Sequence, residues 1–180
     1  MKILTTALPD VLLIEPKVFG DARGFFLESW NRRSFTALGI EADFVQDNHS
    51  KSQQNVLRGL HYQIRQPQGK LVRVIAGEIF DVAVDLRRNS PAFGQWTGFA
   101  LSAENRRMAW IPPGFAHGFC VTSESAEVLY KTTDYWLPDA ERTLQWDDPQ
   151  LAISWPLSGA PVLSAKDAAG LPLAQCDAFA

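Results

Sequence analysis

The stretch Glu78-Ile79-Phe80-Asp81-Val82-Ala83-Val84-Asp85-Leu86, residues 78–86, shows the clearest alternation of side chains in the sequence. Every second residue from Phe80 to Leu86 is apolar, whereas the positions between them mix apolar residues with aspartates. Successive side chains of a β-strand point to opposite faces of its sheet. The stretch therefore predicts a strand with one apolar face and one mixed face.

Short runs of the same kind occur on both sides of this strand. We predict strands over Lys70–Ile75, over Phe115–Thr122 after the turn Pro112-Pro113-Gly114, and over Ala126–Thr133. Helical pattern is weak. Its best case is Asn31–Leu38, with Asn31 as N-cap and Gly39 as the stop, and one or two helical turns are expected after Asp147-Asp148-Pro149. Many short strands with few helices favour an all-β sandwich or barrel.

Length and composition narrow the class of protein. The 180 residues, 46% of them hydrophobic, suit one compact domain over residues 1–180. The formal net charge is −3 and no run of lysine or arginine occurs, which argues against binding to nucleic acid or to a membrane surface. No apolar stretch approaches the ~20 residues that a membrane-spanning helix needs.

The cysteines and the first residues indicate the compartment. Cys120 and Cys176 are the only cysteines and lie far apart in the chain, which favours free thiols in a reducing environment. Pro9 and Asp10 interrupt the first apolar run before it reaches the ~7 to 15 residues of an export signal. We therefore expect a cytoplasmic protein.

His61, in the segment RGLHYQ (residues 58–63), is one of three histidines. Taken alone, it suits a structural, hydrogen-bonded histidine. Arg58 and Lys70 lie close to it in sequence, however, and a closed barrel can direct such polar groups into its mouth, where ligands bind. Strand parity places Arg58 and His61 on opposite faces, so both face one pocket only where a bulge or a strand end intervenes.

A second histidine, His117, follows the turn in WIPPGFAHGF (residues 110–119). The spacing P-x-G-x-x-H resembles a cupin signature. Metal-binding cupins supply H-x-H from their first motif, and here that motif reads His61-Tyr62-Gln63, with glutamine in the place of the second ligand. Since a transition metal needs several such ligands, the resemblance implies a barrel without the usual metal site. The alternative role for His117 is a buried, hydrogen-bonded structural residue.

Six segments together resemble the dTDP-4-dehydrorhamnose 3,5-epimerase family. RGLHYQ, QGKLVRV, GEIFDVAVDLRRNSPAFGQW, WIPPGFAHGF, EVLYKTTDYW and LSAKD occur in the family's order and near its spacings, from about Ile3 to Asp167. The resemblance implies a cupin-type jelly-roll β-barrel with a few short helices, a homodimer, a dTDP-sugar substrate, and no metal or organic cofactor. Two departures are Asn55, where the family often has glycine, and Tyr135-Trp136 in place of two tyrosines.

The resemblance also implies roles for individual residues. The catalytic base is matched by His61, its aspartate partner by Asp167, the active-site lysine by Lys70 and the proton-donating tyrosine by Tyr130. The positions expected to contact substrate are Arg23, Glu28, Gln46, Asn48, Arg58, His117, Glu141 and Lys166.

The implied reaction explains these residue types. A ketone at C4 of the sugar acidifies the hydrogens on C3 and C5, because the carbanion delocalises onto oxygen as an enolate. Histidine, with an ordinary pKa of ~6.5, suits proton removal near neutral pH, and an aspartate fixes its tautomer. Lysine stabilises the enolate oxygen, and tyrosine, with an ordinary pKa of ~10, keeps a proton to deliver from the opposite face.

Other functions remain open from the sequence. A 3-epimerase that inverts one centre of a related dTDP-4-keto-6-deoxy sugar would need the same base, lysine and tyrosine. A non-catalytic cupin that binds a sugar nucleotide would need the pocket without a proton relay. A metal-dependent cupin oxygenase is disfavoured by Gln63.

Overall fold

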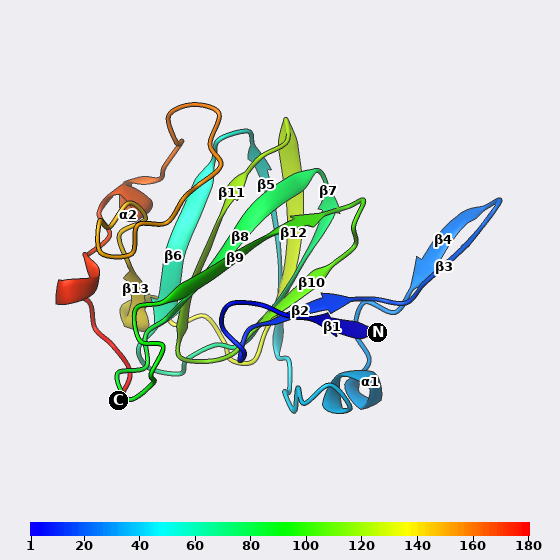
Figure 1. Ribbon diagram of the computed structural model, residues 1–180, viewed down its shortest axis with the longest axis horizontal. Coiled ribbons are helices and arrows are strands. Elements are labelled where there is room, and N and C mark those ends of the chain that lie inside the picture. Colours follow the sequence, from blue (N-terminus) through cyan, green and yellow to red (C-terminus); the bar gives the residue numbers. More distant parts are fainter.

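Two antiparallel sheets packed face to face form the body of the protein (Figure 1). The computed structural model describes residues 1–180. The larger sheet has, in spatial order, β1 (Lys2–Leu4), β2 (Leu12–Glu15), β10 (Met108–Ile111), β7 (Lys70–Ala76), β12 (Ser125–Thr132) and β5 (Gln46–Gln53). The smaller has β13 (Glu141–Thr143), β6 (Leu57–Gln63), β11 (Phe115–Val121), β8 (Glu78–Asp85) and β9 (Trp96–Ser102).

The strand order from β5 to β12 is that of a jelly roll. Strands β5, β12, β7 and β10 are neighbours in one sheet, and β6, β11, β8 and β9 are neighbours in the other. The helical elements are α1 (Arg32–Thr36), α2 (Ala165–Ala168) and the 3-10 turns η1 (Pro138–Ala140) and η2 (Leu173–Gln175). The predicted all-β jelly roll with a few short helices is confirmed.

The predicted elements match the observed ones closely. Strand β8 begins at Glu78 and ends one residue before the predicted Leu86, β7 and β11 differ from prediction by one residue at their C-terminal ends, and β12 begins and ends one residue earlier than predicted. Helix α1 is capped by Asn31, whose side chain accepts a hydrogen bond from the backbone N–H of Ser34, and Gly39 ends the segment with a φ of +85°.

Both faces of β8 are buried. Its mixed face lines the interior between the sheets, where Ile79 and Ala83 belong to the largest apolar cluster and Asp81 and Asp85 are fully buried. The other face packs against the chain's C-terminal segment, which covers the smaller sheet from outside (Figure 1). The two aspartates of the alternating pattern are therefore interior charges that need partners.

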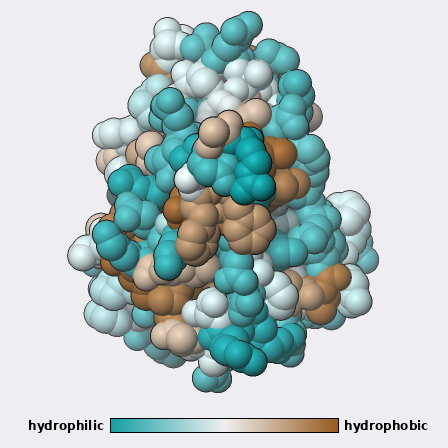
Figure 2. Space-filling view, turned by 90° about the vertical axis from the view of Figure 1, so that its right-hand side faces the viewer, coloured by the Kyte–Doolittle hydropathy of each residue, from teal (hydrophilic) through white to brown (hydrophobic).

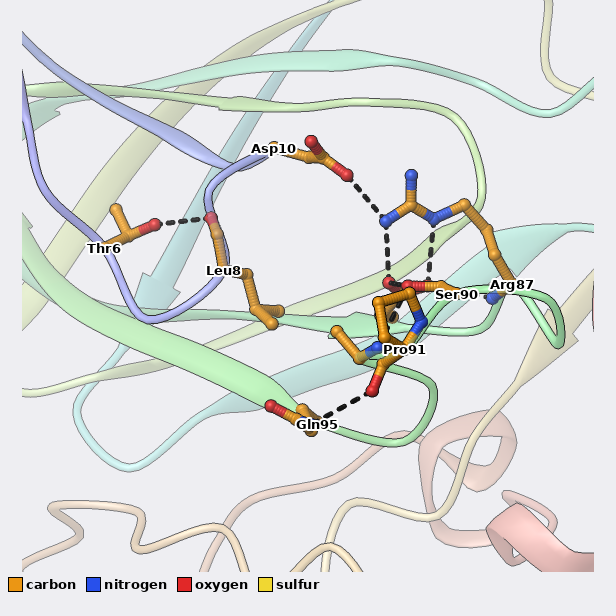
Figure 3. A network of polar contacts seen from close by, with 9 residues as sticks. Thr6, Leu8, Asp10, Arg87, Ser90, Pro91 and Gln95 are labelled. Carbon is orange, nitrogen blue, oxygen red and sulfur yellow. Dashed lines mark hydrogen bonds and ion pairs between the residues drawn. The ribbon is translucent and has the colours of Figure 1, made fainter.

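Asp85 obtains its partners at the end of β8. Its two oxygens accept hydrogen bonds from Arg87 Nε (3.0 Å), Arg87 Nη2 (2.6 Å) and Ser90 Oγ (2.7 Å). Arg87 Nη2 also donates to Asp10 Oδ2 at 2.7 Å, and this contact ties the N-terminal loop to the β8–β9 connection (Figure 3). The charge of Asp85 is thus structural.

A β-bulge interrupts the pairing of β6 with β11. His61 is opposite His117, but Arg58 is opposite Phe119, so three residues of β6 span the same length as two of β11. Gly59 lies in the bulge with a φ of +117°, and a Cβ there would be 2.6 Å from the Cα of Gly118. The bulge turns the side chains of Arg58 and His61 to the same face of β6, so that both line one cavity.

The hairpin of β3 (Val18–Asp21) and β4 (Gly24–Leu27) projects from the body as a separate two-stranded arm (Figure 1). Its apolar residues Val18, Phe19, Phe25 and Phe26 are exposed by 37–65%. Seen from the side on which the arm projects, apolar side chains gather on the face of the molecule (Figure 2). No helix in the protein is both long and apolar enough to cross a bilayer.

Candidate active site

A cavity of 340 Å³ opens between the two sheets and is lined mainly by polar side chains. Strands from both sheets contribute to it, so the groups on its walls face one another across the interior. Its lining residues are Gln46, Asn48, Ser50, Arg58, His61, Gln68, Lys70, His117, Gly118, Phe119, Tyr130, Trp136, Glu141 and Lys166.

His61, on β6, is held by an aspartate from the far end of the chain. Its Nε2 lies 2.6 Å from Oδ1 of Asp167 in α2. The same Oδ1 accepts from the backbone N–H of Gly59 (3.1 Å), and Oδ2 accepts from Ser164 Oγ (2.6 Å). Because a carboxylate accepts hydrogen bonds, His61 Nε2 carries the proton and Nδ1 is left as the basic nitrogen.

The surroundings favour a neutral His61 beside an ionised Asp167. Burial lowers the pKa of His61 below its ordinary value, and the charges of Lys166 and Lys70 act in the same direction, against the opposing effect of Asp167. Burial alone would raise the pKa of Asp167, but the hydrogen bonds from His61, Ser164 and Gly59 outweigh it and hold that pKa well below its usual range. The pair is suited to general-base catalysis.

Lys70, the first residue of β7, brings a buried ammonium group to the same cavity. Its Nζ donates to the backbone carbonyl oxygen of His61 at 3.2 Å. Burial lowers the pKa of Lys70 to about 8, while the charges of Glu141 and Asp81 oppose that shift. A cation in a site with little water is positioned to stabilise negative charge on a bound ligand.

Tyr130 reaches the cavity from β12 in the larger sheet, where it pairs with Val72 of β7 and Asn48 of β5. Burial raises the pKa of its phenol above the ordinary value. The hydroxyl hydrogen-bonds to no protein group, so it is available to a ligand with its proton in place at neutral pH.

His117, on β11, also faces the cavity, and its ring is held by a buried aspartate of the neighbouring strand. Its Nε2 lies 2.8 Å from Oδ2 of Asp81 on the neighbouring β8. His117 is thus buried and hydrogen-bonded, as its structural alternative predicted, and it lines the cavity, while its contact with substrate stays a prediction.

The remaining predicted contacts form two groups on the walls. On β5 and β6, Gln46 Nε2 donates to Asn48 Oδ1 (2.9 Å), and Arg58 Nε donates to Ser52 Oγ (2.9 Å). At the opening, Lys166 Nζ of α2 lies 3.0 Å from Glu141 Oε2 of β13. A bound anion would compete with Glu141 for this lysine.

Gln63, the residue in the place of a second metal ligand, holds a loop. Its Nε2 donates to the carbonyl oxygens of Gln66 (2.9 Å) and Tyr135 (3.2 Å), and its Oε1 accepts from the N–H of Leu137 (2.8 Å). These bonds fix the segment that carries Trp136 at the edge of the cavity. No group of three or more His, Cys, Asp or Glu side chains lies close enough to bind a metal ion.

Arg23 and Glu28 do not reach the cavity of their own chain. Arg23 is at the tip of the β3–β4 arm, where its Nη2 pairs with Asp21 Oδ2 at 2.6 Å, and its side chain is 90% exposed. Glu28 follows β4 and accepts a hydrogen bond from Asn31. Their predicted role as substrate contacts stays a prediction.

Four further residues belong to the site although none was predicted as a substrate contact: Asp81, Ser50, Gln68 and Ser164. Asp81 was visible as a charge inside an apolar alternating strand, which signals a buried polar interaction. Ser50 follows Asn48 by two residues and therefore shares its face of β5. Gln68 and Ser164 lie in loop positions, and no periodic signal marks them.

Comparison with known proteins shows which family this chain resembles. The sequence model of dTDP-4-dehydrorhamnose 3,5-epimerase matches residues 5–175. The dTDP-4-dehydrorhamnose 3,5-epimerase of Pseudomonas aeruginosa is 64% identical over 180 residues, which cover 99% of each chain.

Solved structures agree. The crystal structure of a dTDP-6-deoxy-D-glucose-3,5-epimerase from Legionella pneumophila, in complex with dTDP-4-keto-L-rhamnose, superposes with a TM-score of 0.95 at 55% identity and covers 98% of this chain and 94% of its own. A 3'-monoepimerase from Streptomyces bikiniensis, in complex with dTDP-quinovose, has the same fold with a TM-score of 0.88 at 30% identity, covering 93% and 86%. One-centre and two-centre enzymes thus share this architecture.

Proposed function

The chain belongs to the dTDP-4-dehydrorhamnose 3,5-epimerase family, and from that premise we propose how its cavity performs the reaction. The enzyme is an isomerase that inverts C3 and C5 of dTDP-4-dehydro-6-deoxy-D-glucose to give dTDP-4-dehydro-L-rhamnose. The observation that carries the mechanism is the His61–Asp167 pair facing a cavity that Lys70 and Tyr130 line from the other sheet.

In this mechanism His61 Nδ1 removes the proton from C3 and, in a second round, from C5. Asp167 keeps the other proton on Nε2 and stabilises the imidazolium that forms. The neutral ring that burial favours is the form that accepts a proton. General-base catalysis of this kind contributes roughly 10² to 10⁴-fold in rate.

Lys70 stabilises the enolate oxygen at C4, because its ammonium contact strengthens as negative charge develops there. Tyr130 then delivers a proton to the carbanion from the opposite face. Its elevated pKa keeps the phenol protonated until a strong base, the carbanion, is present. Removal on one face and delivery on the other invert the centre.

For the nucleotide, Arg58 and Lys166 are suited to the diphosphate, since arginine binds phosphate in a bidentate manner and lysine acts as a point charge. Gln46 and Asn48 offer amide donors and acceptors from β5 in the other sheet. Trp136, an exposed aromatic ring at the cavity edge, replaces a tyrosine of the family and is suited to stack on a base.

We further propose that the protein is a homodimer in which the β3–β4 arm packs on the second subunit. The arm exposes four apolar residues, and more than half of the surface of Phe19, Phe25 and Phe26 is left open to solvent. Packing it on a neighbour would also carry Arg23 and Glu28 toward the other subunit's cavity, which accounts for their distance from their own.

Relatives with the 3,5-epimerase name are closer in sequence than the 3'-monoepimerase, and this favours inversion at two centres. The deciding experiment is proton NMR of the enzyme with dTDP-4-keto-6-deoxyglucose in deuterated water. Loss of protium at both C3 and C5 is the expected result. Exchange at C3 alone would identify a 3-epimerase, and no exchange would identify a binding protein.

A further inference from the structure

Two His–Asp pairs lie side by side on one wall of the cavity. His61 and His117 are direct cross-strand partners in β6 and β11. Each histidine uses Nε2 for an aspartate: His61 for Asp167 at 2.6 Å, and His117 for Asp81 at 2.8 Å. In both rings Nδ1 has no partner in the protein. The mechanism above uses the first pair and leaves the second unexplained.

Asp81 is an unusual residue for its position. It is fully buried on the interior face of β8, between Ile79 and Ala83 of the apolar core. Its Oδ2 binds His117, and its Oδ1 has no hydrogen-bond partner at all. A buried carboxylate with one partner destabilises a fold relative to an apolar residue of similar size. Packing alone therefore does not account for Asp81.

The chemistry of the contact fixes the proton of His117. An ionised carboxylate has acceptors and no donor, so the hydrogen bond requires a proton on Nε2 of the imidazole. In the neutral ring the second nitrogen, Nδ1, is then an acceptor. An uncharged amide in the place of the carboxylate would allow the opposite tautomer, with Nδ1 as donor.

We propose that Asp81 is a positioning residue of the active site, which holds the proton of His117 on Nε2 and thereby presents Nδ1 as an acceptor for a hydroxyl group of the sugar. This inference rests on the proposed function for the identity of the ligand. It assigns Asp81 no contact with the substrate. The acceptor Nδ1 of His117 and the basic Nδ1 of His61 then act on the same face of one sugar ring.

The state of His117 can be measured without substrate. The protein has three histidines, so nitrogen-15 NMR of histidine-labelled enzyme gives a spectrum that His49→Gln and His117→Gln variants suffice to assign. A pH series reads the tautomer on the neutral ring. The expected result is a protonated Nε2 and an unprotonated Nδ1 in His117. A proton on Nδ1 would overturn the proposal, and this measurement needs no variant of Asp81.

The isosteric variant Asp81→Asn tests the link to catalysis. We expect kcat to fall roughly 10- to 100-fold, the effect of losing one charge-assisted hydrogen bond, with the His117 proton moved to Nδ1. Assayed at a pH below the pKa of Lys70, which the charge of Asp81 also raises, Asp81→Asn should cause no further loss in a His117→Gln background, because the two residues act as one unit. Losses that multiply, or an unchanged tautomer, would show a merely structural role.

Asp85→Asn is the matched control. Asp85 is equally buried on the same face of β8, but its partners are Arg87 and Ser90, and it does not line the cavity. This variant should lower thermal stability and leave kcat and the His117 tautomer unchanged. Failure of the proposed function would appear separately, as absence of solvent exchange at C3 and C5 in the wild type. The tautomer result would stand in either case.

Discussion

His61 and Tyr130 line the same cavity from opposite sheets, the first from β6 and the second from β12. A planar enolate bound between them would meet a base on one face and an acid on the other. This arrangement is what inversion at carbon requires, and it leads to tests that separate removal of a proton from its delivery.

His61→Ala should abolish solvent exchange at both C3 and C5, because one base serves both carbons. Asp167→Asn should slow both exchanges by a smaller factor, within the roughly 10² to 10⁴-fold range of general-base catalysis. NMR in deuterated water measures both. His49→Ala is the control, since His49 is an exposed histidine of β5 bonded to Glu127. Normal exchange at C5 in the His61 variant would mean that another base serves that carbon.

Tyr130→Phe should uncouple exchange from inversion. The ring keeps its packing while the donor is lost, so His61 still forms the enolate, and the proton it returns goes back to the original face. Recovered starting sugar should carry deuterium with retained configuration, while inverted product falls steeply. Following label and configuration together by NMR checks this. Inversion at the wild-type rate would transfer the role of donor to Tyr135 or to water.

The pH profile of kcat/KM should fall on both sides. His61 must be neutral, and its pKa is lowered by burial, so activity should be lost as pH falls through a value below 6.5. Lys70 must be charged, and its pKa is lowered to about 8, so activity should be lost again as pH rises through about 8. Lys70→Met should remove most of the activity, and the activity that remains should no longer fall as pH rises through about 8. Lys131→Met should leave this alkaline decrease in place. A flat wild-type profile from pH 7 to 9 would contradict the role of Lys70.

Prolonged chelation should leave activity unchanged, because Gln63 occupies the position of a second imidazole ligand and bonds instead to backbone groups of Gln66, Tyr135 and Leu137. The measurement is the epimerase rate after dialysis against EDTA, compared with a sample to which zinc is returned. Loss of activity that zinc restores would overturn this prediction.

Replacing Phe25 and Phe26 together by serine should convert a dimer into a monomer. The two rings are 58% and 65% exposed on the projecting arm, and the change removes the apolar area proposed to pack on the second subunit. Size-exclusion chromatography with light scattering measures the mass. Val162→Ser, at an equally exposed apolar residue off the arm, is the control. A wild-type monomer would refute the dimer directly.

Local patterns in the sequence were sufficient to predict most of the fold. Alternation located β8, turn residues located β11, and Asn31 with Gly39 delimited α1. Asn55 stands where the family often has glycine, and its φ is +61°. Asparagine tolerates this conformation better than other residues with a side chain.

Features that depend on distant parts of the chain were harder to predict. Parity showed that Arg58 and His61 needed a bulge between them, but the pairing of β6 with β11 was required to locate it at Gly59. Asp81 was read as one element of a mixed strand face, since its partner His117 is 36 residues away. The projecting β3–β4 arm was missed because exposed aromatic residues in sequence resemble a core strand.

The partnership of His61 with Asp167 spans 106 residues, and it sets the moment at which the protein gains activity during synthesis. The carboxylate that orients the base comes from α2, which follows the last strand of the barrel, β13, so a nascent chain cannot complete the pair before α2 has left the ribosome. Truncation ahead of Ser164 would remove this carboxylate together with Leu173 and Cys176, which cover the outer face of the smaller sheet, so it would cost stability as well as activity. The catalytic base and the outer core of the smaller sheet thus depend on one and the same C-terminal segment.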